Sequence, residues 1–173
     1  MYSTTIEYDS EIIAKIMNSS INKQELNEII VTDATAGIGG NSIYFSKYFD
    51  KVNAVEINKN RSTYLQNNIN LLNLNNVTVY NDDCLNSCMT LEQNVIFIDP
   101  PWGGPSYKNS NFVDLYINDL IISDVCKKIH DKCQYIFLKV PLNFSFNNFI
   151  SEVTYKRLNI FKLKKMYLIL LKH

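Results

Sequence analysis

Short apolar runs alternate along this chain with segments in which apolar residues recur at helical spacing. Runs that are continuously apolar are typical of strands buried on both faces of a parallel sheet. The pattern predicts strands at 29–34, 52–57, 77–80, 94–98 and 134–140. It predicts helices at 10–18, 41–49, 58–72, 114–129 and 142–150, the first with Ser10 as its N-cap and the third beginning at Asn58.

The last part of the chain has a different pattern. Residues 155–161 and 166–171 are typical of two strands joined through a turn at Lys164 and Lys165, which predicts a β-hairpin. Strands that alternate with helices and end on a hairpin indicate an α/β fold. In such a fold a mostly parallel sheet carries helices on both faces and tolerates an antiparallel strand at its end.

Composition places the chain among ordinary globular proteins. Its 173 residues are 46% apolar and 20% charged, which suits a single domain over 1–173. The sequence has no apolar leader and no run of membrane-spanning length, so we expect a soluble, intracellular protein of the cytoplasm or nucleus without a membrane partner. Its cysteines form no CxxC pair and have no nearby histidine cluster in sequence, so we expect free thiols and no metal. Abundant Asn, Ile and Lys are typical of an AT-rich genome, viral or parasitic.

Charge is balanced overall but unevenly distributed. A formal net charge of zero argues against a protein that grips long nucleic acid with its whole surface. From Val153 onward, however, every charged residue is Lys or Arg. This basic end fits two interpretations. It forms a small face that meets a few phosphates at an RNA 5′ end, or it is a solvated edge hairpin whose lysines deter aggregation.

The segment 98–107, with the sequence IDPPWGGPSY, is the most informative part of the chain. It follows the predicted strand 94–98, so Asp99, two prolines and the only Trp emerge where open α/β sheets bind ligands. Proline fixes φ and donates no N–H, so the carbonyls beside Pro100 and Pro101 are rigidly held acceptors. A planar exocyclic amine needs such acceptors and an aromatic ring on which to stack, which Trp102 supplies.

Asp-Pro-Pro-Trp resembles motif IV of amino-group methyltransferases that use S-adenosylmethionine, and PPWGGPSY at 100–107 resembles the signature of the trimethylguanosine synthase family. That family methylates guanine N2 of RNA caps. The resemblance runs from about residue 9 to the end of the chain. It implies a Rossmann-like class I methyltransferase fold with strand order 3-2-1-4-5-7-6, S-adenosyl-L-methionine as cofactor and a capped RNA 5′ end as partner. Asp99 departs from the family, which often has Ser there, and favours the general amino-methyltransferase pattern.

A loop with the sequence DATAGIGGN at 33–41 lies between the first predicted strand and the next helix. Two details distinguish it from a dinucleotide-binding loop: Ser42 stands at the third glycine position, and Asp33 ends the strand. Asp33 would repel a pyrophosphate but attract the cationic amino-acid end of S-adenosylmethionine. Glycines let the backbone approach a ligand closely. We therefore expect cofactor contacts from Asp33, Ala36, Gly37 and Gly39.

Further acids follow the next two predicted strands. Glu56 lies 23 residues after Asp33, close to the ~20-residue spacing at which an acid meets ribose hydroxyls in nucleotide-binding folds. The resemblance implies that Asp83 accepts a hydrogen bond from the adenine amine, while the backbone N–H of Cys84 contacts the ring. Plainer alternatives remain: Glu56 is a surface acid at a strand end, and Asp82 or Asp83 caps a turn.

The predicted reaction is an in-line methyl transfer, in which the protein chiefly aligns the acceptor lone pair with the methyl carbon. Asp99 and the Pro100 carbonyl would accept hydrogen bonds from the amine, beside Pro101. A cationic 7-methylguanine ring would gain about 0.5–2 kcal/mol from stacking on Trp102. The resemblance implies further substrate contacts from Asn41, Lys139 and Tyr107, with Lys139 near the cap phosphates. The alternative for Asn41 is a helix cap, and the alternative for Tyr107 is a structural role.

Residues 1–28 are expected to form a short N-terminal helical segment or lid that includes Tyr2 and Tyr8. The family usually has an additional helical segment before the catalytic core, so either the lid is minimal here or a partner protein replaces it. Two alternative functions stay open. The first is methylation of guanine N2 or adenine N6 in other RNA or DNA. The second is RNA binding by a methyltransferase-fold subunit without catalytic activity.

Overall fold

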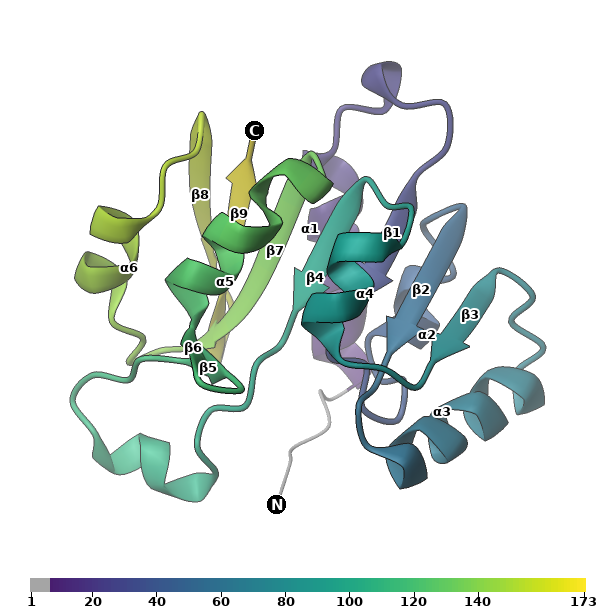
Figure 1. The fold of residues 1–173 in the computed structure, drawn as a ribbon, viewed down its shortest axis with the longest axis horizontal. Coiled ribbons are helices and arrows are strands. Elements are labelled where there is room, and N and C mark those ends of the chain that lie inside the picture. The colour runs from purple at the N-terminus through teal and green to yellow at the C-terminus, as the bar shows by residue number, and fades with distance from the viewer. Residues whose placement is uncertain (1–6) are drawn as a thin grey trace.

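The computed structural model describes residues 7–173, so the prediction for Tyr2 lies outside the described residues. A seven-stranded sheet runs through the molecule with helices on both faces (Figure 1). Its strands, in chain order, are β1 (Ile30–Asp33), β2 (Lys51–Val55), β3 (Val77–Tyr80), β4 (Val95–Ile98), β7 (Tyr135–Pro141), β8 (Arg157–Lys162) and β9 (Met166–Lys172). They stand in the order β3-β2-β1-β4-β7-β9-β8. Numbered only among themselves, they follow 3-2-1-4-5-7-6, so the predicted Rossmann-like fold is confirmed.

Strand direction decides where a ligand can bind. The strands β3, β2, β1, β4 and β7 pair in parallel, and β9 pairs antiparallel with both β7 and β8. The carboxyl ends of the five parallel strands therefore meet at one edge of the sheet, the lower edge in Figure 1. Pro141 at the end of β7 pairs with Met166, so the turn that contains Lys164 and Lys165 lies at this same edge.

The helices, in chain order, are α1 (Glu7–Ser20), η1 (Lys23–Glu25), α2 (Ser42–Phe45), α3 (Lys59–Leu71), α4 (Cys84–Thr90), η2 (Pro105–Asn109), α5 (Ile122–Ile129), η3 (His130–Lys132) and α6 (Phe146–Glu152). A buried cluster joins α1 and α2 to one face of the sheet through Met17, Phe45 and Phe97. A second cluster joins α5 and α6 to the other face through Val125 and Phe149. No helix within residues 7–173 is long and apolar enough to cross a membrane.

Successive side chains of β7 point to opposite faces of the sheet. Tyr135 and Phe137 belong to the cluster beneath α1 and α2, whereas Ile136 and Leu138 belong to the cluster beneath α5 and α6. The same alternation places Lys139 on the α1 and α2 face, inside the strand rather than at its end. Lys139 is buried there, with only 3% of its surface exposed.

Most predicted strands agree with the structure, but the helix predicted over 114–129 is wrong in its first half. That part forms a small hairpin of β5 (Tyr116–Ile117) and β6 (Leu120–Ile121). Asn118 has a φ of 52° at the turn, a conformation that Asn tolerates better than most residues. The helix begins only at Ile122, so a local turn signal overrode the helical spacing of the apolar residues.

Three other helices also differ from their predictions. The helix predicted over 41–49 is a single turn, α2, and the one predicted over 142–150 begins four residues later, at Phe146, after the turn that follows Pro141. The helix α4 was not predicted, because its sequence CLNSCMT lacks an apolar stripe. Ser10 is not an N-cap: it lies within α1, and its Oγ donates to Asn41 Oδ1 at 3.0 Å.

Candidate active site

The predicted acceptor motif and the glycine loop meet at the carboxyl edge of the sheet. Asp33 is the last residue of β1, and Asp99 directly follows the adjacent strand β4. The backbone N–H of Asp99 donates to Thr35 Oγ1 at 2.8 Å, and Ala34 N–H donates to the Phe97 carbonyl at 2.9 Å. These contacts tie the loop after β1 to the loop after β4, so the two predicted halves of the site are neighbours.

Asp33 is fully buried at the centre of this edge. Ser42 Oγ donates to its Oδ2 at 2.6 Å, while Oδ1 is buried and has no hydrogen-bond partner within residues 7–173. Burial raises the pKa of the Asp33 carboxyl to about 7, and the nearby Asp99 carboxylate adds to this effect, whereas the Ser42 hydrogen bond opposes it. A buried carboxylate oxygen without a partner would gain from an approaching cation.

The glycine loop holds two residues in backbone conformations that disfavour larger side chains. Gly37 has a φ of 59° and Gly39 a φ of 102°. A Cβ on Gly37 would meet no atom within 4 Å, so the backbone there borders open space. A Cβ on Gly39 would lie 2.8 Å from Leu65 Cδ1, so this glycine lets α3 pack against the loop. Ala36 is buried, and its N–H donates to the Val55 carbonyl at 2.9 Å.

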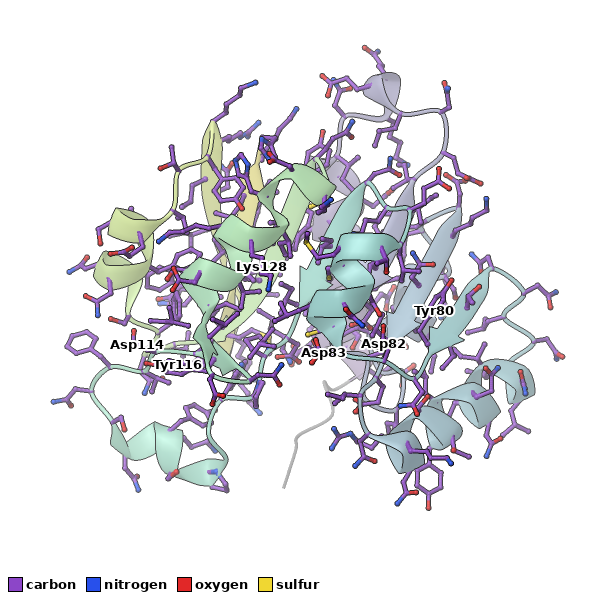
Figure 2. All side chains as sticks on the ribbon, in the orientation of Figure 1. Tyr80, Asp82, Asp83, Asp114, Tyr116 and Lys128 are labelled. Carbon is purple, nitrogen blue, oxygen red and sulfur yellow. The ribbon has the colours of Figure 1, made fainter. Side chains whose placement is uncertain are left out.

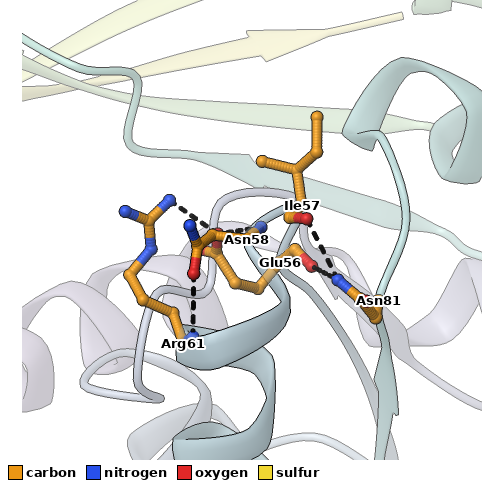
Figure 3. A network of polar contacts seen from close by, with 5 residues as sticks. All are labelled: Glu56, Ile57, Asn58, Arg61 and Asn81. Atoms are coloured by element: carbon orange, nitrogen blue, oxygen red, sulfur yellow. Dashed lines mark hydrogen bonds and ion pairs between the residues drawn. The ribbon is translucent and has the colours of Figure 1, made fainter.

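Glu56 directly follows β2 and lies at the centre of a polar network (Figure 3). Its Oε1 accepts hydrogen bonds from Asn58 N and from Arg61 Nη2, each at 2.7 Å, and Asn81 Nδ2 donates to its backbone carbonyl at 2.8 Å. Glu56 is only 6% exposed, so it is not the surface acid that the plainer alternative described. Asn58 is also the N-cap of α3, as predicted, since its Oδ1 accepts from Arg61 N.

Asp82 and Asp83 lie beside the start of α4 (Figure 2). Asp83 is the N-cap: its Oδ1 accepts from Leu85 N at 2.7 Å, and its Oδ2 accepts from Asn118 Nδ2 at 2.9 Å. The Ser87 hydroxyl and the Asp83 N–H donate to Asp82 and lower the pKa of the Asp82 carboxyl. Burial raises the pKa of the Cys84 thiol to about 12, so the thiol stays protonated at neutral pH.

The acceptor motif contains a buried ion pair that the sequence did not reveal. Lys139 Nζ lies 2.6 Å from Asp99 Oδ2, with only 4% of the lysine side chain and 17% of the aspartate side chain exposed. The same Nζ lies 5.2 Å from the centroid of the Trp102 ring. The predicted contact of Lys139 with cap phosphates is therefore not what the geometry shows, because its ammonium points to the acid and the indole.

Trp102 is half-buried, and its indole packs partly against both core clusters of the sheet. Tyr107, in η2, meets the Trp102 ring edge-on with centroids 5.3 Å apart, which supports the structural reading of Tyr107. Pro100 is buried and Pro101 is exposed, so the turn is anchored on one side only. Asn41 is 6% exposed and stands at the N-cap position of α2, but its side chain makes no capping hydrogen bond and its Oδ1 accepts from Ser10 instead.

The two histidines, 43 residues apart in sequence, also come together at the opposite edge of the sheet. His130 Nδ1 lies 3.0 Å from Asp131 Oδ1, and His173 Nε2 lies 3.9 Å from the same oxygen. Among the described residues these three form a group that could hold a metal ion. No local spacing signalled this group, because α5, η3 and β9 bring its members together.

Comparison with known proteins assigns the chain to a family. Residues 28–168 match the family described as RNA cap guanine-N2 methyltransferase. The chain belongs to the RNA cap guanine-N2 methyltransferase family. It is 37% identical over 154 residues to a protein of Acanthamoeba polyphaga mimivirus, covering 86% of this chain and 60% of that protein. It is 31% identical over 126 residues to the trimethylguanosine synthase of Schizosaccharomyces pombe, covering 69% of this chain and 49% of that protein. The chain thus spans about half to 60% of the length of these relatives.

Solved structures agree on the fold of this cap methyltransferase family member. An rRNA methylase from Streptococcus thermophilus matches with a TM-score of 0.63 at 13% identity, covering 93% of each chain. A SAM-dependent O-methyltransferase from Thermotoga maritima matches with a TM-score of 0.72 at 12% identity, covering 99% of this chain and 67% of that one. A Streptococcus mutans protein with a TM-score of 0.63 at 15% identity was solved in complex with SAH; 94% of this chain and 96% of that one are covered. At these identities the likeness shows the fold alone.

Membership of the cap methyltransferase family implies S-adenosylmethionine as cofactor, and the residues at the edge fit such a group. The cofactor carries a cationic amino-acid end, a ribose with two hydroxyls and an adenine amine. Along the carboxyl edge stand a buried carboxylate with an unpaired oxygen, Asp33, and a second acid that follows the neighbouring strand, Glu56. Between them the loop at Gly37 borders open space. No phosphate-binding cation is needed in this arrangement.

Proposed function

We propose that this chain transfers a methyl group from S-adenosylmethionine to guanine N2 of a 7-methylguanosine RNA cap. The observation that carries the proposal is the hydrogen bond from Asp99 N to Thr35 Oγ1, 2.8 Å long, which joins the acceptor motif to the cofactor loop. The family match over 28–168 supports the same assignment. A runner-up is an amino-methyltransferase for guanine N2 or adenine N6 in other RNA or DNA, which Asp99 in motif IV favours.

In this mechanism the chain binds the cofactor and orients the acceptor amine toward it. The cofactor supplies a methyl group on a sulfonium. The residues that would hold it are Asp33, Ala36, Gly37, Gly39, Glu56, Asp83 and the backbone N–H of Cys84. Glu56 would use Oε2 for a ribose hydroxyl, because Oε1 already accepts from Asn58 and Arg61.

The acceptor side needs hydrogen-bond acceptors more than a base. The lone pair of an exocyclic amine is delocalised into its ring, so the amine is a poor nucleophile. Asp99 and the Pro100 carbonyl would accept from its N–H groups and favour the pyramidal state, and Trp102 would stack on the ring. Correct alignment is the larger contribution, because in-line attack depends on near-attack geometry. The amine can lose its proton after transfer.

The RNA beyond the cap would meet the basic end of the chain. The turn with Lys164 and Lys165 is exposed and lies at the carboxyl edge of the sheet, beside the end of β7. This placement supports contact with a few phosphates, although β8 is also the edge strand of the sheet. The start of α1 lies close to the loop after β1, since Ser10 binds Asn41 and the Tyr44 hydroxyl donates to Glu7 at 2.5 Å. A partner protein that completes a lid would therefore approach α1.

A methyl-transfer assay across acceptors tests the proposal. Tritiated S-adenosylmethionine would be offered with m7GpppN, GpppN, uncapped RNA and duplex DNA. Transfer to m7GpppN alone is expected. Equal transfer to GpppN would show that the activity does not depend on the cationic ring. Transfer only to uncapped RNA or DNA would favour the runner-up, an amino-methyltransferase for other RNA or DNA. Calorimetric titration with S-adenosylmethionine separates both from an inactive RNA-binding subunit, which would show no heat of binding.

Trp102→Ala is expected to lower kcat/KM for m7GpppN by about 10- to 100-fold. Stacking of a base on an aromatic side chain contributes about 1–3 kcal/mol, and a cationic ring adds to it. Trp102→Phe is the matched control, because it keeps a stacking face and should recover most of the loss. S-adenosylmethionine affinity should stay unchanged in both variants. An unchanged kcat/KM in Trp102→Ala would contradict the assigned stacking.

Asp83 can be tested for its two roles separately. Asp83→Ala removes the N-cap of α4 and should cost about 1 kcal/mol of unfolding free energy, as N-cap deletions do. Asp83→Ser keeps a good capping residue but removes the carboxylate, so stability should be retained while S-adenosylmethionine affinity falls about tenfold, the effect of one hydrogen bond of ~1.4 kcal/mol. Chemical denaturation and calorimetry measure the two quantities. Wild-type affinity in Asp83→Ser would restrict Asp83 to capping.

A further inference from the structure

Lys139 contacts both chemically important side chains of the acceptor motif. Its ammonium group lies 2.6 Å from Asp99 Oδ2 and 5.2 Å from the centre of the Trp102 ring. We propose that Lys139 is a positioning residue, whose ammonium group fixes the Asp99 carboxylate and the Trp102 indole in the relative arrangement that accepts the exocyclic amine. The inference rests on the proposed function, because it concerns the same acceptor site.

The burial of Lys139 argues against an ion pair with Asp99 that has no role in the site. Lys139 sits in the middle of β7, on the face where Tyr135 and Phe137 pack into an apolar core. An ammonium group in such a place loses its hydration, and a buried ion pair often contributes less stability than apolar residues of the same volume. An apolar residue at 139 would therefore suit the fold at least as well. The stability of the fold therefore does not account for a buried charge at this position, whereas the acceptor site beside it does.

The geometry shows what that requirement is. The aspartate side chain is 17% exposed and the lysine side chain only 4%, so the lysine approaches Asp99 from the core while part of the carboxylate reaches the surface of the site. A carboxylate held from behind has few alternative rotamers. The indole is held by the same ammonium group and by the edge contact with Tyr107. One buried cation thus orients the hydrogen-bond acceptor and the stacking surface together.

The charges around Lys139 give a second reason to assign it a positioning role. Asp33 lies near enough to this pair that Asp99 raises, and Lys139 lowers, the pKa of the Asp33 carboxyl. Without the ammonium group, the pKa of the Asp33 carboxyl would rise further, and the Asp99 carboxylate would lose the ion-pair partner that holds it from the core side. The Asp99–Lys139 pair is neutral as a unit. Loss of Lys139 would misplace the acceptor, yet it would leave the site more negative and no less attractive to a cationic ring.

This reasoning predicts a specific kinetic signature for Lys139→Met, an uncharged side chain of similar length. The kcat for the methylated acceptor should fall at least tenfold, while KM for a 7-methylguanosine cap should not rise and S-adenosylmethionine affinity should stay within about twofold. Lys139→Arg keeps the cation and should recover most of kcat. In a double-mutant cycle, Asp99→Asn combined with Lys139→Met should be no slower than the slower single variant, because the two residues act as one unit.

The split between kcat and KM is the readout that a purely structural role would not produce, and fluorescence checks the contact between the ammonium group and the indole on which it depends. Trp102 is the only Trp of the chain, so its emission reports directly on the ammonium group above the ring. Lys139→Met should shift the emission maximum, whereas Lys128→Met, an exposed lysine on α5, should leave both emission and kcat unchanged. Emission identical to wild type in Lys139→Met, or a kcat within twofold of wild type, would overturn the proposal. If wild type methylates only another acceptor of the panel, the proposed cap function fails, while the fluorescence shift and the kcat on that acceptor still decide the role of Lys139.

Discussion

Asp33→Asn is expected to abolish the pH dependence of stability that comes from this carboxyl and to weaken cofactor binding in the same protein. The pKa of the Asp33 carboxyl is about 7 in the folded state against 3.8 for an unperturbed Asp. The folded state therefore holds this proton more tightly than the unfolded state between about pH 4 and pH 7. Stability from this group is fully present below pH 4 and is lost as pH rises through 7, by roughly 4 kcal/mol at about 1.36 kcal/mol per pKa unit.

Asparagine removes that titration. Its amide places an N–H₂ group where Oδ1 of Asp33 has no partner, which costs about 1–3 kcal/mol for a buried unsatisfied group. At pH 8 the variant should therefore be about 1–3 kcal/mol more stable than wild type, and at pH 4 it should be less stable. Urea unfolding at several pH values measures this crossover. Asp124→Asn, on the exposed side of α5, is the control and should show no crossover.

Cofactor affinity should increase with pH, whereas the stability that comes from Asp33 decreases with pH. A cation that approaches Oδ1 of Asp33 favours the ionised carboxyl, so wild-type affinity for S-adenosylmethionine should increase as pH rises through about 7. Asp33→Asn should bind about 10- to 100-fold more weakly at pH 8, because a hydrogen bond to a charged group contributes about 1.5–3 kcal/mol. Its affinity should also be nearly independent of pH between 6 and 8. A variant more stable than wild type that binds equally well would show that Asp33 does not contact the cofactor.

The elements that position the site could be predicted because their signals are local. Residues 95–98 are continuously apolar and end at Asp-Pro-Pro-Trp, so the strand and the chemistry at its carboxyl end are visible together in the sequence. Asn58 likewise marks the start of α3 by its own capping chemistry. The order of the strands came from resemblance, because apolar runs carry no information about which neighbours they pair with.

The parts that could not be predicted depend on contacts between distant residues. Lys139 and Asp99 are 40 residues apart, and only the pairing of β4 with β7 brings their side chains to one face. Ser10 shows the same limit: its sequence context suggests a cap, but its hydroxyl binds Asn41, 31 residues later. The hairpin at Asn118 was missed because the apolar spacing around it also fits a helix.

Asp99→Ala is expected to lower the free energy of unfolding more than any other single substitution in the site. It removes the Asp99 carboxylate from the buried Lys139 ammonium group, whose side chain is only 4% exposed. Removal of one member of a buried ion pair typically costs about 3–5 kcal/mol, most of which is the penalty for the remaining charge. Methyl transfer should fall by about 10²- to 10³-fold, as for other preorganised groups at a reacting centre.

The double variant Asp99→Ala/Lys139→Met distinguishes the two losses. It also removes the buried ammonium group that has lost the Asp99 carboxylate, so its free energy of unfolding should return to within about 1 kcal/mol of wild type, while methyl transfer stays at the level of Asp99→Ala. Urea unfolding and the methyl-transfer assay measure the two effects on the same samples. If the double variant were as unstable as Asp99→Ala, the destabilisation would come from lost packing rather than from an uncompensated charge. If Asp99→Ala kept full activity, the amine acceptor would have to be another group at this edge, and the Pro100 carbonyl is the nearest candidate in the sequence.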